Sequence, residues 1–223
     1  MNIAVYSGSF NPLHIGHLAI MKYLIGEGGY DSVYLIVSPK NPLKEGIDSA
    51  SGQARYDAAV EAVNRHFNSE AEPEKHVENM PPPARGCPAN GRTEVFGMFS
   101  STASCSPKVH VDDIELNMPA PHYTIRTLDA LREREPDNSF TLVMGADNLA
   151  DIRRWRDYRR ILKEYGAAVY PRKGFDLATI KEGLMTEDHD YRIDILNAEM
   201  VDISSTIIRD AIAEGQDVSQ WLM

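Results

Sequence analysis

The sequence has few cysteines, no long apolar run and no excess of basic residues. Its two cysteines, Cys87 and Cys105, lack a CxxC spacing and nearby clustered histidines, so neither a zinc site nor a disulfide framework is predicted. No segment reaches membrane-spanning length, and no charged region precedes a long apolar stretch at the N-terminus, so we expect a cytoplasmic protein without a membrane partner. The net charge of −10 does not favour binding to nucleic acid or to an anionic membrane, so any phosphate binding must be local.

The 223 residues, 43% of them hydrophobic, fit one domain spanning residues 1–223. Short β-rich runs alternate with apolar residues at helical spacing, which predicts an α/β fold with a parallel sheet covered by helices on both faces. The predicted strands are Ile3 to Tyr6, Val33 to Val37, Val109 to Leu116, Phe140 to Met144, Ala167 to Tyr170 and Ile193 to Val201. The predicted helices are Gly16 to Ile25, Gln53 to Phe67, Thr124 to Glu133, Tyr158 to Tyr165, Leu177 to Gly183 and Ser204 to Ala213.

One stretch, Asn68 to Pro107, breaks this alternation. It contains the runs PPP, PARGCPANG and SSTASCS and has few periodic apolar residues. We interpret it as a flexible insertion at 68–107, because its composition favours disorder. A lid over the ligand or a contact in a homo-oligomer is the functional alternative.

The segment IAVYSGSFNPLHIGHLAIM predicts a strand, a turn containing Gly8, and then two histidines at the start of a helix. Ligands of open parallel sheets bind beyond the carboxyl ends of the strands, where a helix N-terminus offers free N–H groups to phosphate. His14 and His17 are three residues apart and can project to the same side, with Gly16 leaving space between them. Alternatively, one histidine satisfies a buried carbonyl and the other lies on the surface.

The run GSFNPLHIGH resembles the GxFxPxHxGH signature of the nucleotidyltransferase superfamily, which has an HxGH motif and a Rossmann-like fold. Neither GxGxxG nor GxxxxGK[ST] follows the first strand, so dehydrogenase and kinase interpretations lose support. The resemblance implies that His14 and His17 are catalytic. It also implies that these two histidines bind ATP together with Gly8, Ser9, Phe10 and Gly16.

Near the other end of the chain, ISSTIIRDAI resembles the ISSTxxR motif of the same superfamily. Hydroxyl groups at a helix N-terminus cap the helix or contact phosphate, and the guanidinium of Arg209 can hold two phosphates. Simple capping is the alternative for Ser204. The resemblance implies that Ile203, Ser204 and Ser205 bind ATP and that Arg209 is both catalytic and ATP-binding.

A narrower resemblance comes from MGADNLADIRRW, which is similar to the GADN-L segment and following tryptophan of bacterial nicotinate-nucleotide adenylyltransferases. Gly145, Asp147 and Asn148 follow an apolar strand, at the edge where ligands are expected. The resemblance implies that Gly145 and Asp147 bind ATP, with Asp147 on the ribose, and that Asn148 binds the acceptor. It also implies that Trp155 stacks on a pyridine ring, whereas a core tryptophan is the alternative.

Two further segments are similar to those of this family. NPLKEGIDSASGQAR carries a lysine followed at a set spacing by an arginine, and DIELNMPAPHYTIRTL matches a DIEL…P-x-YTxxTL pattern. The resemblance implies that Lys44 is catalytic and neutralises substrate phosphate, and that Tyr123 and Thr124 form part of the acceptor pocket. Arg55 is followed by YDAAV rather than Leu-x-Met, which leaves substrate contacts from that helix undefined.

The implied function is adenylyl transfer from ATP to nicotinate mononucleotide in NAD biosynthesis. Magnesium is then the expected cofactor, held by ATP and water rather than by a metal site of the protein itself. Two alternatives stay open: transfer to another phosphorylated acceptor such as phosphopantetheine, and a catalytically silent nucleotide-binding protein. The sequence does not decide between nicotinate and nicotinamide mononucleotide, which differ in one carboxylate or amide.

Overall fold

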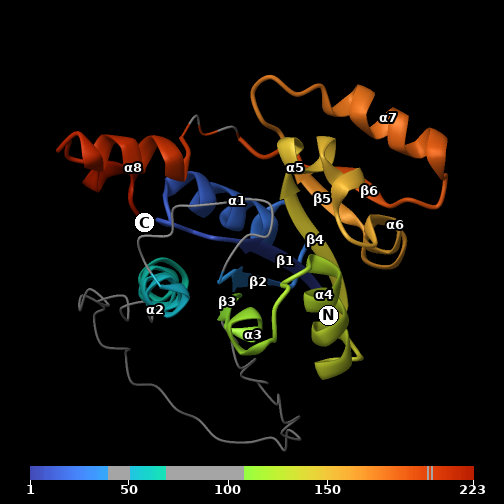
Figure 1. The fold of residues 1–223 in the computed structure, drawn as a ribbon, viewed down its shortest axis with the longest axis horizontal. Helices are drawn as coiled ribbons and strands as arrows, with labels where there is room; N and C mark the ends of the chain where they lie inside the picture. Colours follow the sequence, from blue (N-terminus) through green and yellow to red (C-terminus); the bar gives the residue numbers. More distant parts are fainter. Residues whose placement is uncertain (40–50, 69–107, 200, 202) are drawn as a thin grey trace, which may run out of the picture.

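A computed structural model describes residues 1–39, 51–68, 108–199, 201 and 203–223 of the chain. Its centre is a six-stranded sheet in the order β3-β2-β1-β4-β5-β6, and every neighbouring pair of strands is parallel. The strands are β1 (Asn2–Gly8), β2 (Ser32–Val37), β3 (Val109–Asp112), β4 (Ser139–Gly145), β5 (Ala167–Tyr170) and β6 (Ile193–Ile195). Because β1 and β4 lie side by side at the middle, the chain builds the sheet outward from this pair in two directions (Figure 1).

Helices cover both faces of the sheet. They are α1 (Ile15–Gly26), α2 (Gly52–Val63), α3 (Ile114–Asn117), α4 (Thr124–Arg134), α5 (Ala146–Ala150), α6 (Tyr158–Arg160), α7 (Leu177–Glu187) and α8 (Ser205–Ala213). Within β1, Ile3 and Val5 join a core built with α4, α5 and α7, whereas Ala4 and Tyr6 join a second core built with α1 and α2. This alternation buries both faces of the strand and confirms the predicted fold class.

Two predicted strands are too long. The strand predicted to reach Leu116 ends at Asp112, because the Asp112 carboxylate accepts the Ile114 N–H at 2.9 Å and the chain then turns into α3. The strand predicted to reach Val201 ends at Ile195, because its neighbour β5 ends at Tyr170 and Pro171 has no N–H to extend the pairing.

Three predicted helices also have different boundaries. The helix expected over 53–67 ends at Val63 and continues as a π-helical turn, Asn64–Asn68. The helix expected over 158–165 is the short α6 followed by a second π-helical turn, Ile161–Tyr165, whereas α7 continues beyond Gly183 to Glu187. None of the helices described is both long and apolar enough to cross a membrane. The predicted insertion at 68–107 lies outside the described residues except for Asn68.

Candidate active site

The turn after β1 carries the two histidines into α1, and their rings lie with centroids 3.7 Å apart. His14 is the N-cap of α1, and its Nδ1 accepts the Gly16 N–H at 3.1 Å. His17 Nδ1 accepts the His14 N–H at 3.2 Å, which completes a capping box. Since each Nδ1 is an acceptor, each neutral ring carries its proton on Nε2 and keeps one N–H donor for a ligand.

Both histidines are neutral at physiological pH. Loss of hydration lowers the pKa of His14 to about 4, and the positive charge of Arg172 adds to this effect. Loss of hydration also lowers the pKa of His17 well below its usual value, with further contributions from His14 and Arg172. The pair therefore offers hydrogen-bond donors of fixed tautomer rather than two positive charges.

These lowered pKa values predict a pH-dependent stability. Below about pH 6.5 both histidines of the unfolded chain bind protons, whereas in the folded protein the pKa of His14 is about 4 and that of His17 is well below its usual value. The free energy of unfolding therefore falls as the pH decreases. His14→Asn keeps an N-cap acceptor but removes one titrating ring. Urea unfolding between pH 7 and 4 should show a shallower decrease for this variant, by up to about 1.4 kcal/mol per pH unit. Parallel curves for the two proteins would contradict this assignment.

The glycines of the turn make room for neighbouring side chains. A Cβ at Gly8 would lie 3.0 Å from the Phe10 ring, and Phe10 itself has a positive φ of 44°. A Cβ at Gly16 would lie 3.0 Å from the His14 ring and 3.2 Å from Ile203 Cγ2. Side chains at either position would therefore displace a group that shapes the turn.

A pocket of about 520 Å³ opens beside the histidines at the carboxyl ends of the strands. It brings together five of the predicted ATP-site residues from two distant segments: His14, Gly16 and His17 from the first, and Ile203 and Ser204 from the second. Arg172 also lines the pocket, two residues beyond β5, and sequence reasoning missed it. The available signal was its place directly after an apolar strand, the same signal that indicated Asp147 after β4.

Asp147 and Arg172 face each other across the ends of β4 and β5. Asp147 Oδ1 lies 3.5 Å from Arg172 Nε, and both atoms are buried without a hydrogen bond from any residue that the structure describes. A Cβ at Gly145 would lie only 2.3 Å from Asp147 Oδ1, so this glycine is required for the present position of the carboxylate. The site thus offers an acidic and a basic group at the same strand edge.

The predicted Ser205 and Arg209 contact the turn after β1. Ser205 Oγ donates to the Pro12 carbonyl at 3.1 Å, and Arg209 Nη1 donates to the Asn11 carbonyl at 2.8 Å. Ser204 is the N-cap of α8, and its side chain accepts the Ile207 N–H. These contacts place α8 beside α1 (Figure 1), while direct phosphate contacts from Ser205 and Arg209 stay predictions.

The predicted acceptor residues lie at the start of α4, on α5 and after the 3₁₀ turn Ile152–Arg154 that follows α5. Tyr123 lines a second pocket of about 380 Å³, together with Arg126 and Arg156. Thr124 begins α4, Asn148 is exposed on α5, and Trp155 is partly buried against the core beneath α4 and α7. Packing against the core and stacking on a ligand are compatible for a partly exposed indole. Lys44 lies outside the described residues.

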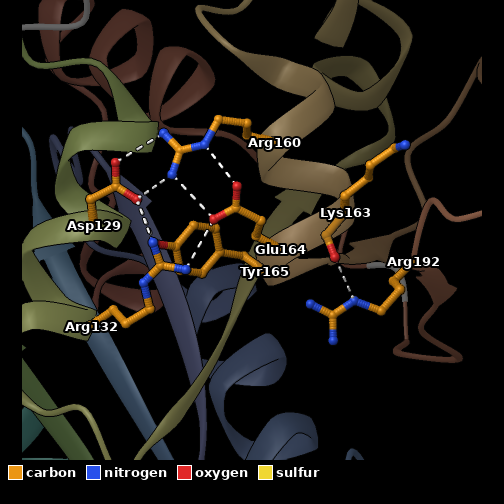
Figure 2. A network of polar contacts seen from close by, with 7 residues as sticks. All are labelled: Asp129, Arg132, Arg160, Lys163, Glu164, Tyr165 and Arg192. Atoms are coloured by element: carbon orange, nitrogen blue, oxygen red, sulfur yellow. Dashed lines mark hydrogen bonds and ion pairs between the residues drawn. The ribbon is translucent and has the colours of Figure 1, made fainter.

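A network of polar contacts joins α4 to the segment that follows Trp155 (Figure 2). Arg160 donates to both carboxylate oxygens of Asp129, at 3.2 and 3.0 Å, and Tyr165 donates to the same carboxylate at 2.6 Å. Arg132 and Glu164 form a further ion pair at 3.0 Å. These contacts hold together the two segments that line the second pocket.

The parallel sheet, the histidine turn at its middle strand and the converging α8 define a nucleotide-binding α/β protein with the HxGH arrangement of nucleotidyltransferases. Comparison with known proteins agrees: the cytidylyltransferase-like family model matches residues 5–211. A probable nicotinate-nucleotide adenylyltransferase of Flavobacterium psychrophilum is 32% identical over 222 residues, covering 100% of this chain and 92% of the relative. Another from Bacteroides fragilis is 31% identical, covering 98% and 85%.

The chain belongs to the cytidylyltransferase-like family and, within it, to the nicotinate-nucleotide adenylyltransferases. This confirms the resemblance inferred from the motifs. The solved nicotinic acid mononucleotide adenylyltransferase of Plasmodium falciparum, complexed with NaAD, has a TM-score of 0.67 at 15% identity and covers 99% of this chain and 90% of its own. At this identity the match shows the fold alone.

Proposed function

We propose that this enzyme transfers the adenylyl group of ATP to nicotinate mononucleotide, giving nicotinate adenine dinucleotide and pyrophosphate in NAD biosynthesis. The observation that carries the proposal is the pair His14 and His17, fixed by backbone N–H groups so that both Nε2–H donors remain for a ligand. Relatives matched over their length have names that specify this reaction.

In the proposed reaction, a phosphate oxygen of the mononucleotide attacks the α-phosphorus of ATP. The bond from the α-phosphorus to the oxygen bridging to the β-phosphate breaks, and its electron pair leaves with pyrophosphate. Phosphate is already a competent nucleophile, so the protein has to position two anions and stabilise the charge that develops. His14 and His17 donate to triphosphate oxygens, and Arg172 supplies positive charge at the same pocket.

The remaining groups hold the two substrates. Asp147 is placed to accept hydrogen bonds from the adenosine ribose, at the strand end where nucleosides bind in such sheets. Trp155, together with Tyr123, Thr124 and Asn148, forms the acceptor side, with the pyridine ring on the indole. Lys44 and Arg209 complete the proposed catalytic set by reducing repulsion between phosphates.

Magnesium enters this scheme as a partner of ATP. Within the part of the chain that the structure describes, no group of three or more His, Cys, Asp or Glu side chains could hold a metal ion. In this proposal the ion is held by phosphate oxygens and water, and when bound it neutralises phosphate charge. The neutral histidines suit this arrangement, because they can donate to phosphate oxygens without repelling the cation.

The test is pyrophosphate release by the purified protein with ATP and magnesium. Parallel reactions should contain nicotinate mononucleotide, its amide, or phosphopantetheine as acceptor. We expect efficient release with nicotinate mononucleotide and little with phosphopantetheine, since the acceptor pocket is proposed to hold a pyridine ring. Equal use of the nicotinate and nicotinamide forms would remove the proposed preference, and no release with any acceptor would overturn the enzymatic function.

A further inference from the structure

A buried arginine with no role in the proposed mechanism lies next to the turn between β1 and α1. Arg55, in the first turn of α2, is 4% exposed. Its Nη1 donates to the carbonyl oxygens of Ser9, at 2.6 Å, and Ser38, at 2.8 Å, while Nη2 donates to the Pro39 carbonyl at 2.8 Å. Removing a guanidinium from water costs free energy unless hydrogen bonds compensate, and these carbonyl acceptors provide that compensation.

The three carbonyls belong to the ends of two adjacent strands. Ser9 follows β1, Ser38 and Pro39 follow β2, and the Ser38 N–H donates to the Gly8 carbonyl at 2.9 Å. Arg55 therefore fixes the chain where it leaves the sheet, at the beginning of the turn that carries His14 and His17. A planar guanidinium can hold several carbonyls in one geometry, which a single ammonium cannot do.

The bond to Ser9 also sets the orientation of a peptide group. In a trans peptide the carbonyl and the following N–H point in opposite directions, so the Ser9–Phe10 peptide directs its N–H away from Arg55. The partial negative charge of the carbonyl is thereby turned toward a guanidinium instead of toward an incoming phosphate. This matters most at a triphosphate site, where a misdirected carbonyl would repel the ligand.

Ser38 is held from a second side by a buried carboxylate. Its hydroxyl donates to Glu115 Oε2 at 2.6 Å, and Glu115, which is 2% exposed, also accepts the Thr127 hydroxyl at 2.7 Å. Glu115 lies on α3 and Thr127 on α4. The ends of β1 and β2 are thus connected through buried polar groups to helices on both faces of the sheet.

We propose that Arg55 is a positioning residue for the ATP-binding turn: by holding the Ser9, Ser38 and Pro39 carbonyls it fixes the backbone from which His14 and His17 extend. The inference rests on the proposed function, because it assigns ATP to this turn. Under this proposal, Lys44 and Arg55 have different roles although they lie in the same sequence segment. The arginine acts through the backbone of the turn, without touching substrate itself.

The test compares Arg55→Lys and Arg55→Met with Arg65→Met, which removes an exposed arginine of the π-helical turn after α2. Pyrophosphate release gives kcat and both KM values, and calorimetric titration with a non-hydrolysable ATP analogue gives its Kd. We expect the KM for ATP and the Kd of the analogue to rise about tenfold in Arg55→Met, while the KM of the acceptor changes by less than about twofold. Arg55→Lys should recover part of this loss, and Arg65→Met should match the wild type.

Two results would overturn the proposal. One is a folded Arg55→Met protein, by circular dichroism, that binds the ATP analogue as the wild type does. The other is an equal loss for ATP and acceptor, which indicates a general packing role. If Arg55→Met does not fold, Arg55→Lys decides by the same comparison. If the wild type releases no pyrophosphate, the proposed function fails, whereas analogue binding by the variants still tests Arg55.

Discussion

Replacing His17 with alanine is expected to lower kcat by about 10²- to 10³-fold, the loss typical of removing one preorganised donor to a developing negative charge. The His17 ring is neutral, and its Nδ1 accepts the His14 N–H, so Nε2–H remains as the donor that we propose for a triphosphate oxygen. Because this interaction strengthens in the transition state, kcat should fall more than the KM for ATP rises.

Two controls separate this effect from damage to the turn. His17→Gln keeps an acceptor at the third position of α1, as glutamine does in a capping box, but moves the donor away from the Nε2 position. It should therefore fold as well as the wild type and still be slow. His189→Ala, at an exposed histidine after α7, should leave turnover unchanged. Near-normal turnover of His17→Ala would refute its role as a donor in the transition state.

Gly145→Ala is expected to lower kcat/KM for ATP by about 10²-fold, as expected when a substrate-positioning group is displaced by an ångström or more. Gly145 has φ −79°, which alanine adopts freely, so the backbone should not be strained. The new methyl group would instead lie 2.3 Å from Asp147 Oδ1 and 3.1 Å from Arg172 Nε. The carboxylate proposed to hold the ribose must therefore move.

The matched control is Gly183→Ala on α7, where a Cβ would meet no heavy atom within 4 Å. This change should leave both KM values unaltered and raise the free energy of unfolding by about 0.5–1 kcal/mol, because alanine favours a helix interior. Steady-state kinetics and urea unfolding of the two variants make the comparison. An unchanged KM for ATP in Gly145→Ala would show that the position of Asp147 is unimportant for ATP binding.

The sequence was sufficient to predict the sheet and most helices, since alternating and helical apolar patterns persist along each element. It was insufficient where one local contact decides a boundary. The bond from Ile114 N–H to Asp112 converts a predicted strand into α3, and such a side-chain choice leaves no periodic signal. The end of β6 depends on where its neighbour β5 stops, which is information from another segment.

The candidate site, like the fold, could be predicted from the sequence only in part. The motifs and the places directly after strands were sufficient to predict that His14, His17 and Asp147 lie at one edge of the sheet. The direction of a side chain depends on contacts distant in sequence, as with Arg209, which reaches back to the Asn11 carbonyl. The sequence carries no signal that Arg55 is buried, since arginine is usually exposed and the carbonyls that it contacts come from other segments.

The contacts between α8 and the first turn have a consequence for the order of events during synthesis. The Ser205 hydroxyl and the Pro12 carbonyl are 193 positions apart, and the Arg209 bond spans 198. All six strands leave the ribosome before α8 does, so the strands of a nascent chain can pair before the histidine turn has gained its contacts with α8. We therefore expect a chain truncated before α8 to gain less stabilisation from ATP than the full chain does.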